Sequence, residues 1–171
     1  GEQLLASSRP ELAPLQGYNA SKGFYYYGVK VHILGYRRPG TLPFPECIEL
    51  TPASDHDLTV LRAIFHYLSV GELYADKAYV DEMLKQILQK EQNMSLQTPI
   101  KKAKGQKRLP MFEQLFSTSV SRVRQPIESL FNWIEEKTGI QVASKVRSFN
   151  GLMVHVFGRL AAAMFMLVFN S

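Results

Sequence analysis

The sequence contains little cysteine: Cys47 is the only one among 171 residues. A single thiol excludes an internal disulfide, and it leaves no cysteine pair of the kind that opens a zinc-binding motif. The four histidines show neither an HExxH motif nor paired spacing. Disulfide-stabilised scaffolds and thiolate or histidine metal centres are therefore not expected, and a reducing, cytosolic setting fits this composition.

Long apolar runs are also scarce. The most apolar stretch, residues 160–169, is too short to span a bilayer, so we expect a buried terminal helix and no membrane partner. The first residues contain neither a basic segment nor a continuous apolar one, so no signal peptide is predicted. The chain starts without methionine and close to a strand-like run, which predicts a fragment of a longer protein.

The overall composition is that of a folded globular protein, with 46% hydrophobic and 20% charged residues. Because 171 residues suffice for one hydrophobic core, we predict a single domain over residues 1–171. The net charge of +5 fits a polyanionic partner such as nucleic acid, although it does not require one.

The pattern of apolar residues predicts alternating strands and helices. Strands are expected at 4–6, 24–37, 46–50, 71–76 and 94–97, with a polar turn at 17–23, and helices at 57–68, 80–91, 112–137 and 149–169. A lysine-rich stretch, KKAKGQKR at 101–108, is expected to be a loop. This order predicts the α/β class with a mixed sheet flanked by helices.

Two carboxylates, Asp76 and Glu128, are candidates for a ligand-binding or catalytic role. Asp76 ends a short strand, and ligands bind beyond the carboxyl ends of strands in open α/β folds. Its alternative role is to begin a turn and cap the next helix. Glu128 shares a helix face with Arg124, four residues earlier, and its alternative role is to belong to a solvated charged face.

Four segments together resemble the DDE-type insertion-sequence transposase family, which is RNase H-like. They are GYNASKGFYYYGVKVHIL (17–34), ELTPASDHDLTVLRAI (49–64), LYADKAYVDEML (73–84) and SRVRQPIESLFNWIEEKTGI (121–140), and they follow the order of the family. The resemblance covers the chain from about Ser7 to Ile140. It implies an RNase H-like catalytic domain for Mg²⁺-dependent DNA cleavage and strand transfer, in a prokaryotic cytoplasm or nucleoid.

The resemblance assigns Asp76 as the second and Glu128 as the third metal-binding and catalytic carboxylate. Mg²⁺, or Mn²⁺ in its place, is the implied cofactor, because hard cations prefer oxygen ligands. Double-stranded DNA, as transposon ends and target, is the implied partner, and a homodimer is a candidate assembly. The implied DNA contacts are Arg124 and the basic residues of the expected loop: Lys101, Lys102, Lys104, Lys107 and Arg108.

The sequence departs from the family at three positions. Ser7 stands where the first catalytic aspartate is expected, and no aspartate precedes Asp55. Glu135 stands at the position of the family's lysine, and Ser121 at that of its tyrosine. The upstream DNA-binding domain expected for the family is not recognisable either.

The Ser7 substitution leaves several hypotheses open, because a serine hydroxyl is a much poorer Mg²⁺ ligand than a carboxylate. The chain is either a transposase domain with impaired or lost activity or a catalytically dead DNA-binding relative. Another RNase H-like nuclease and a purely structural α/β domain are the remaining alternatives.

Overall fold

The computed structural model describes residues 16–19, 24–55, 57–64, 68–143, 146 and 148–169, with side chains from residue 28 onward except that of Asp57. These residues form two compact units. Unit 1 comprises residues 1–55 and 126–171, and unit 2 comprises residues 56–125. The single domain predicted from composition remains a prediction.

Unit 2 is built on a strand-helix-strand motif. Strands β5 (Gly71–Tyr74) and β6 (Met94–Gln97) pair in parallel, and helix α3 (Glu82–Glu91) connects them. Around them lie helix α2 (Asp57–Ile64), the short 3-10 helix η3 (Lys77–Tyr79) and the start of helix α4 (Met111–Thr138). The strands and helices predicted for unit 2 are confirmed. Most of their ends lie within two residues of the predicted ends.

The sequence of α3 explains why a helix forms between these strands. Asp81 precedes the helix and accepts hydrogen bonds from the backbone N–H groups of Met83 and Leu84, which have no partner within the first turn. Leu84 and Leu88 are one helical turn apart and fully buried, so they form one apolar face of α3. A parallel strand pair needs such a helix face to cover it.

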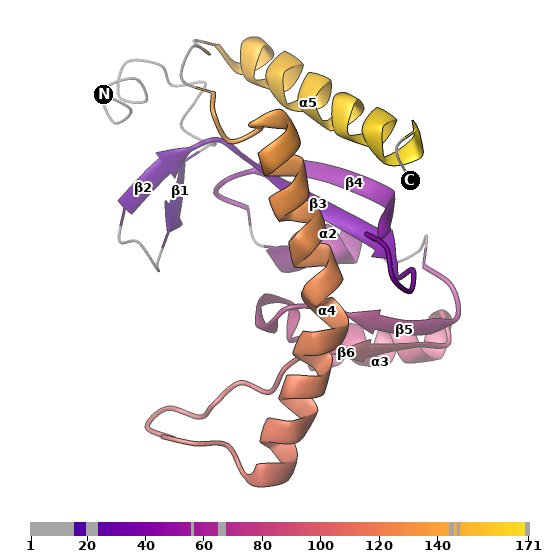
Figure 1. Cartoon of the computed structure of the whole chain (residues 1–171). Helices are drawn as coiled ribbons and strands as arrows, with labels where there is room; N and C mark the ends of the chain where they lie inside the picture. Colours follow the sequence, from indigo (N-terminus) through magenta and orange to yellow (C-terminus); the bar gives the residue numbers. More distant parts are fainter. Residues whose placement is uncertain are drawn as a thin grey trace. The chain divides into compact units, whose positions relative to one another are not determined.

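Unit 1 contains two antiparallel strand pairs. Strand β1 (Gln16–Asn19) pairs with β2 (Phe24–Tyr27), and β3 (Val29–Tyr36) pairs with β4 (Phe44–Pro52). The pairing of β3 with β4 shifts between Leu34 and Gly35, which marks a bulge. The second half of α4 and helix α5 (Phe149–Phe169) lie beside the β3–β4 pair (Figure 1).

The core of unit 1 lies between α4, α5 and β3. Its centre is Leu130 and Ile134 of α4 with Ala163 and Leu167 of α5, and Ile33 of β3 packs against them. These residues recur at helical spacing on α4 and α5, so each helix directs one apolar stripe inward. Trp133 is a partly buried neighbour of this core.

Four expectations about the strands, the sheet and the helices need correction. Residues 16–19, inside or next to the predicted turn at 17–23, form strand β1. The predicted strand at 24–37 is two strands that break at Gly28, and the described residues form three two-stranded sheets rather than one mixed sheet. Helix α5 is buried on one side only, because Val154, Phe157 and Phe165 are more than half exposed. The predicted strand at 4–6 lies outside the described residues.

Helix α5 also corrects the estimate of apolar length. It has 21 residues and a mean hydropathy of 2.0 in its most apolar window, so by length and composition alone it is able to cross a bilayer. The core helix of a soluble protein meets the same criterion, which therefore does not decide where α5 lies.

Candidate functional site

Asp76 lies two residues beyond the end of β5, at the carboxyl end of the parallel strand pair in unit 2. The preceding residue stays in the ladder, since the Ala75 N–H donates to the Gln97 carbonyl oxygen. Asp76 itself has an extended backbone and caps η3, with its Oδ1 accepting from the Lys77 N–H at 2.6 Å. The capping role considered from sequence is thus real, but it concerns η3, whereas Asp81 caps α3.

Arg124 supplies a second contact to the same carboxylate. Its Nη1 lies 3.6 Å from Asp76 Oδ1, and the Arg124 side chain is only 15% exposed whereas that of Asp76 is 55% exposed. Both contacts of the Asp76 carboxylate therefore use Oδ1. In the described part of the chain no residue donates a hydrogen bond to Oδ2, so this oxygen is able to accept one from water or to bind an external cation.

Glu128 lies one helical turn after Arg124 on α4, and its side chain is exposed. Asp76 and Arg124 belong to unit 2, whereas Glu128 belongs to unit 1. Within the described residues no three histidine, cysteine, aspartate or glutamate side chains gather as metal ligands. Ser7 lies outside those residues, so the position expected to complete the carboxylate set has no structural description.

The donor chemistry of Asp76 and Glu128 fits a hard divalent cation. Each offers carboxylate oxygen, the ligand type that Mg²⁺ and Mn²⁺ prefer, and each side chain is exposed. Cys47 is unsuited to compete as a soft ligand or nucleophile, because burial and then the charges of Glu49 and Glu46 raise the pKa of its thiol.

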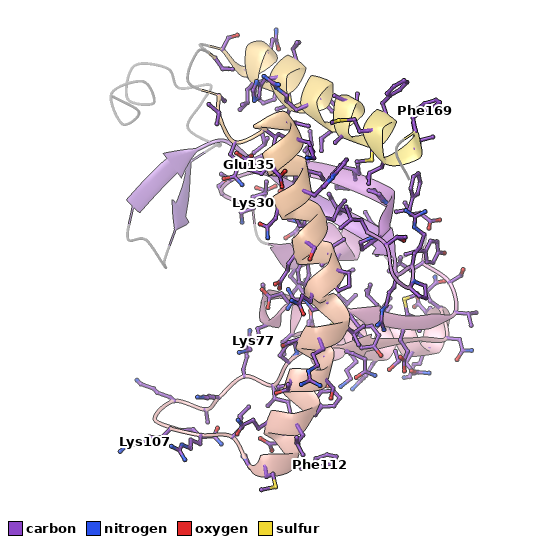
Figure 2. The ribbon with its side chains drawn as sticks, in the orientation of Figure 1. Lys30, Lys77, Lys107, Phe112, Glu135 and Phe169 are labelled. Carbon is purple, nitrogen blue, oxygen red and sulfur yellow. The ribbon has the colours of Figure 1, made fainter. Side chains whose placement is uncertain are left out.

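The loop at residues 101–108 is a hydrogen-bonded turn. The Lys102 Nζ donates to the Lys107 carbonyl oxygen, and the Ala103 N–H donates to the Gln106 side chain. Gly105 has a φ of +86°, which favours glycine at the tip. All five basic side chains of this loop are exposed: Lys101, Lys102, Lys104, Lys107 and Arg108. Figure 2 shows Lys107 at its outer end.

Unit 2 carries most of the positive charge of the chain. Residues 56–125 contain eleven lysines and arginines against seven aspartates and glutamates, so their net charge is +4 of the total +5. The basic loop supplies five of those eleven cations without an acidic residue between them. A surface of this composition suits a polyanion whose phosphates exchange bound counterions for protein cations.

Two departures from the expected motif have structural explanations. Glu135 Oε2 accepts a hydrogen bond from the Gln141 N–H at 2.9 Å, so this carboxylate holds the chain after α4. The Ser121 hydroxyl donates to the Ser117 carbonyl oxygen at 2.8 Å, within its own helix. Neither side chain presents the lysine or tyrosine chemistry expected at its position.

Sequence reasoning missed two ion pairs in unit 2. Arg62 of α2 pairs with Asp81, and Arg124 pairs with Asp76. The contact of Arg124 with Asp76 was missed because a partner 48 positions away in the chain leaves no periodic signal in a sequence.

Comparison with protein families identifies a match over most of the chain. The family model described as "Transposase DDE domain" matches residues 14–148. No match is found among curated proteins or among solved structures.

Proposed function

Because the chain belongs to the transposase DDE domain family, we propose that it is a transposase catalytic domain of RNase H-like fold that acts on transposon ends and target DNA. The observation that carries this proposal is Asp76: a carboxylate beyond the end of a parallel strand, fixed through one oxygen and open at the other. A prokaryotic cytoplasm or nucleoid is the proposed location.

Asp76 and Glu128 are the proposed ligands of Mg²⁺ or Mn²⁺. When bound, such an ion lowers the pKa of a coordinated water or 3′-hydroxyl and neutralises charge on the leaving oxygen. Arg124 orients the Asp76 carboxylate by holding Oδ1, which leaves Oδ2 as the ligand atom. The role of Arg124 as a direct phosphate contact belongs to the same proposal, since its planar group donates to phosphate as well as to carboxylate.

Lys101, Lys102, Lys104, Lys107 and Arg108 are the proposed phosphate contacts. Their exposure on a hydrogen-bonded turn supports this role, because the turn holds five cations close together at the surface without an acidic residue between them. Each phosphate neutralised steepens the dependence of log affinity on log salt by about 0.9 for duplex DNA.

Nicking of supercoiled plasmid in the presence of Mg²⁺ tests the catalytic proposal. The proteins compared are the wild type, Ser7→Asp, and Ser7→Asp combined with Glu128→Gln or with Asp76→Asn. We expect nicking by Ser7→Asp and its loss in both double variants, with Mn²⁺ binding, followed by electron paramagnetic resonance, weakened in parallel. Equal silence of all four proteins with unchanged Mn²⁺ binding contradicts the proposed ligands.

A catalytically dead DNA-binding relative is the second candidate, favoured by the serine at position 7 and by the charge of unit 2. Fluorescence anisotropy with a duplex of random sequence measures this binding directly. Lys101→Glu with Lys104→Glu is expected to weaken binding at least tenfold and to reduce the salt slope. Lys85→Glu with Lys90→Glu, on exposed sites of α3, makes the same charge change away from the loop and serves as the matched control.

Three outcomes separate the candidates. Binding without nicking, in the wild type and in Ser7→Asp, supports the dead relative. Nicking without joining of a donor end to target DNA supports another RNase H-like nuclease. Equal weakening of binding by the loop pair and by the α3 pair shows that net charge rather than the loop governs affinity.

A further inference from the structure

Helix α5 is apolar on most of its circumference but is covered on one side only. Its buried side consists of Val156, Leu160, Ala163 and Leu167. On the opposite side the exposed fractions are 74% for Val154, 59% for Phe157, 64% for Phe165, 53% for Val168 and 69% for Phe169. A helix that is apolar on most of its circumference is normally enclosed on more than one side, so the exposed side calls for a further cover.

The outer face of α5 consists of these five exposed residues with Gly158 and Ala161. It contains no charged side chain, because the only charged residue of the helix, Arg159, lies outside this arc at 100° per residue. His155 is engaged elsewhere, with its Nε2 2.9 Å from the Ile140 carbonyl oxygen. Phe165 and Phe169 stack with ring centroids 4.4 Å apart, and Figure 2 shows Phe169 at the end of the helix.

Five of the seven residues of the outer face are placed symmetrically about Ala161, whereas Gly158 and Phe169 have no counterpart on this face. Phe157 and Phe165 stand four positions before and after it, and Val154 and Val168 stand seven positions before and after it. The same face repeats at the four-and-three spacing with which one helix packs along another. An antiparallel pair of identical helices, related by a two-fold axis at Ala161, would place like side chains at matching heights.

We propose that the outer face of α5 is the interface of a homodimer in which two copies of the helix pack antiparallel across a two-fold axis. Phe157 meets Phe165 of the partner subunit, and Val154 meets Val168 of the partner subunit. Small residues at the crossing point, Ala161 and the neighbouring Gly158, let the two backbones approach closely. A Cβ on Gly158 would meet no atom within 4 Å in one copy, so space for a partner exists there.

The area of the outer face agrees with this assembly. Three phenylalanines that are each about two-thirds exposed, at roughly 200 Å² apiece, and two valines contribute about 600 Å² per copy. The pair would then bury about 1,200 Å², the lower bound for a stable interface. Self-association also explains why the face contains no charge or hydrogen-bonding group that would select a different protein.

A lipid surface fits the outer face less well than a second copy does. Helices that lie in a membrane interface carry lysines and arginines along their polar border, whereas α5 has only Arg159. Its opposite side is already packed on the core of unit 1. Binding of the wild type to lipid vesicles is the outcome that would favour a lipid surface over a second copy.

Light scattering after size exclusion tests the assembly with the 171-residue chain. We expect the wild type to have about twice the monomer mass of 19.4 kDa. Phe157→Ser with Phe165→Ser should run as a monomer. Met111→Ser with Phe112→Ser, at residues that are each 81% exposed in unit 2, removes comparable apolar surface and should leave the dimer intact. Circular dichroism of each variant confirms folding.

Disulfide trapping tests the geometry without disrupting the core. In a Cys47→Ser background, Ala161→Cys should form an intermolecular disulfide, and Val154→Cys alone should not. Val154→Cys combined with Val168→Cys should do so. Efficient self-linking of Val154→Cys overturns the antiparallel arrangement. A monomeric wild type at all concentrations, or a wild type that binds phosphatidylcholine vesicles instead of dimerising, overturns the proposal whether or not the chain nicks or binds DNA.

Discussion

Two aspartates near the end of β5, Asp76 and Asp81, both cap helices, but their carboxylates are used differently. Asp81 accepts two backbone hydrogen bonds and pairs with Arg62, and only 12% of its side chain is exposed. Asp76 accepts one backbone hydrogen bond, and its contact with Arg124 is longer than a normal hydrogen bond. Asp81 is thus committed to structure, whereas Asp76 retains an oxygen for a ligand.

The difference predicts an acid-sensitive role for Asp81. The side chain of Arg62, with the backbone N–H groups of Leu84 and Met83, lowers the pKa of Asp81. A lowered folded-state pKa stabilises the fold above the ordinary aspartate value and loses that effect as the pH falls through the folded value. Asp81→Ala should therefore lower the free energy of unfolding by about 1 kcal/mol at pH 7. Urea unfolding between pH 7 and pH 3 should show this difference shrinking below about pH 5.

Arg62→Gln is the matched test of the cause. Because the arginine contact is the largest cause of the lowered pKa of Asp81, this variant should reduce the pH dependence that Asp81 contributes while keeping the cap. A pH dependence equal to that of the wild type would mean that the backbone hydrogen bonds to Asp81 dominate.

Substitution of Arg124 should affect ligand binding more than the stability of the fold. Arg124→Gln should lower the free energy of unfolding by about 1 kcal/mol, since the Asp76 carboxylate of this ion pair is more than half exposed although the Arg124 side chain is largely buried. Mn²⁺ binding and DNA affinity should nevertheless change, because the cation that orients Asp76 is gone. A large loss of stability, seen in urea unfolding, would place Arg124 among the structural residues instead.

At the scale of elements, α4 contains an internal proline. Pro126 has no N–H to donate to the carbonyl oxygen four residues earlier, and it stands where unit 2 ends and unit 1 resumes. Pro126→Ala should raise the free energy of unfolding by about 2 kcal/mol, since restoring the hydrogen bond outweighs the greater entropy of the unfolded chain. Asn132→Ala, at an exposed position of the same helix, should change it by less than about 0.5 kcal/mol.

Two glycines should respond to alanine with opposite signs. Gly139 follows α4 with a φ of +60°, so Gly139→Ala should cost about 1 kcal/mol although no atom obstructs the new methyl group. Gly158 lies within α5 and has open space within one subunit, so Gly158→Ala should stabilise the monomeric Phe157→Ser, Phe165→Ser variant by about 0.5 to 1 kcal/mol, whereas in the proposed dimer the added methyl group would obstruct the partner helix. Thermal unfolding of the two variants decides whether backbone angle, rather than space, sets the sign.

The elements that the sequence predicted well are those with strong local patterns. Helix α3 has a capping aspartate and regularly spaced leucines, and β6 has buried residues at alternate positions. The boundary at Gly28 was missed because the alternation of apolar residues continues through it. Strand β1 was missed because Gln16–Asn19 has no apolar alternation, and its pairing with β2 is a tertiary choice.

At the scale of the whole molecule, composition predicted a polyanionic partner but not where the charge lies. The division into units places +4 of the net charge in unit 2. In the same way, hydropathy predicted a helix at the end of the chain but not which side of it is covered, because Phe157 and Leu160 are equally apolar in sequence. Coverage depends on what packs against α5, and no periodic pattern records that.

The two units also differ in how they are strung along the chain. Unit 2 is continuous, whereas unit 1 joins residues 1–55 to residues 126–171. During synthesis unit 2 is complete before the ribosome has made the helical segments that cover β3. The side chain of Ile33 therefore stays exposed to solvent until Leu130 and Ala163 have been synthesised. The β3–β4 pair is therefore the segment that needs protection on the ribosome, and chaperones that bind exposed apolar strands should meet nascent chains of this protein there.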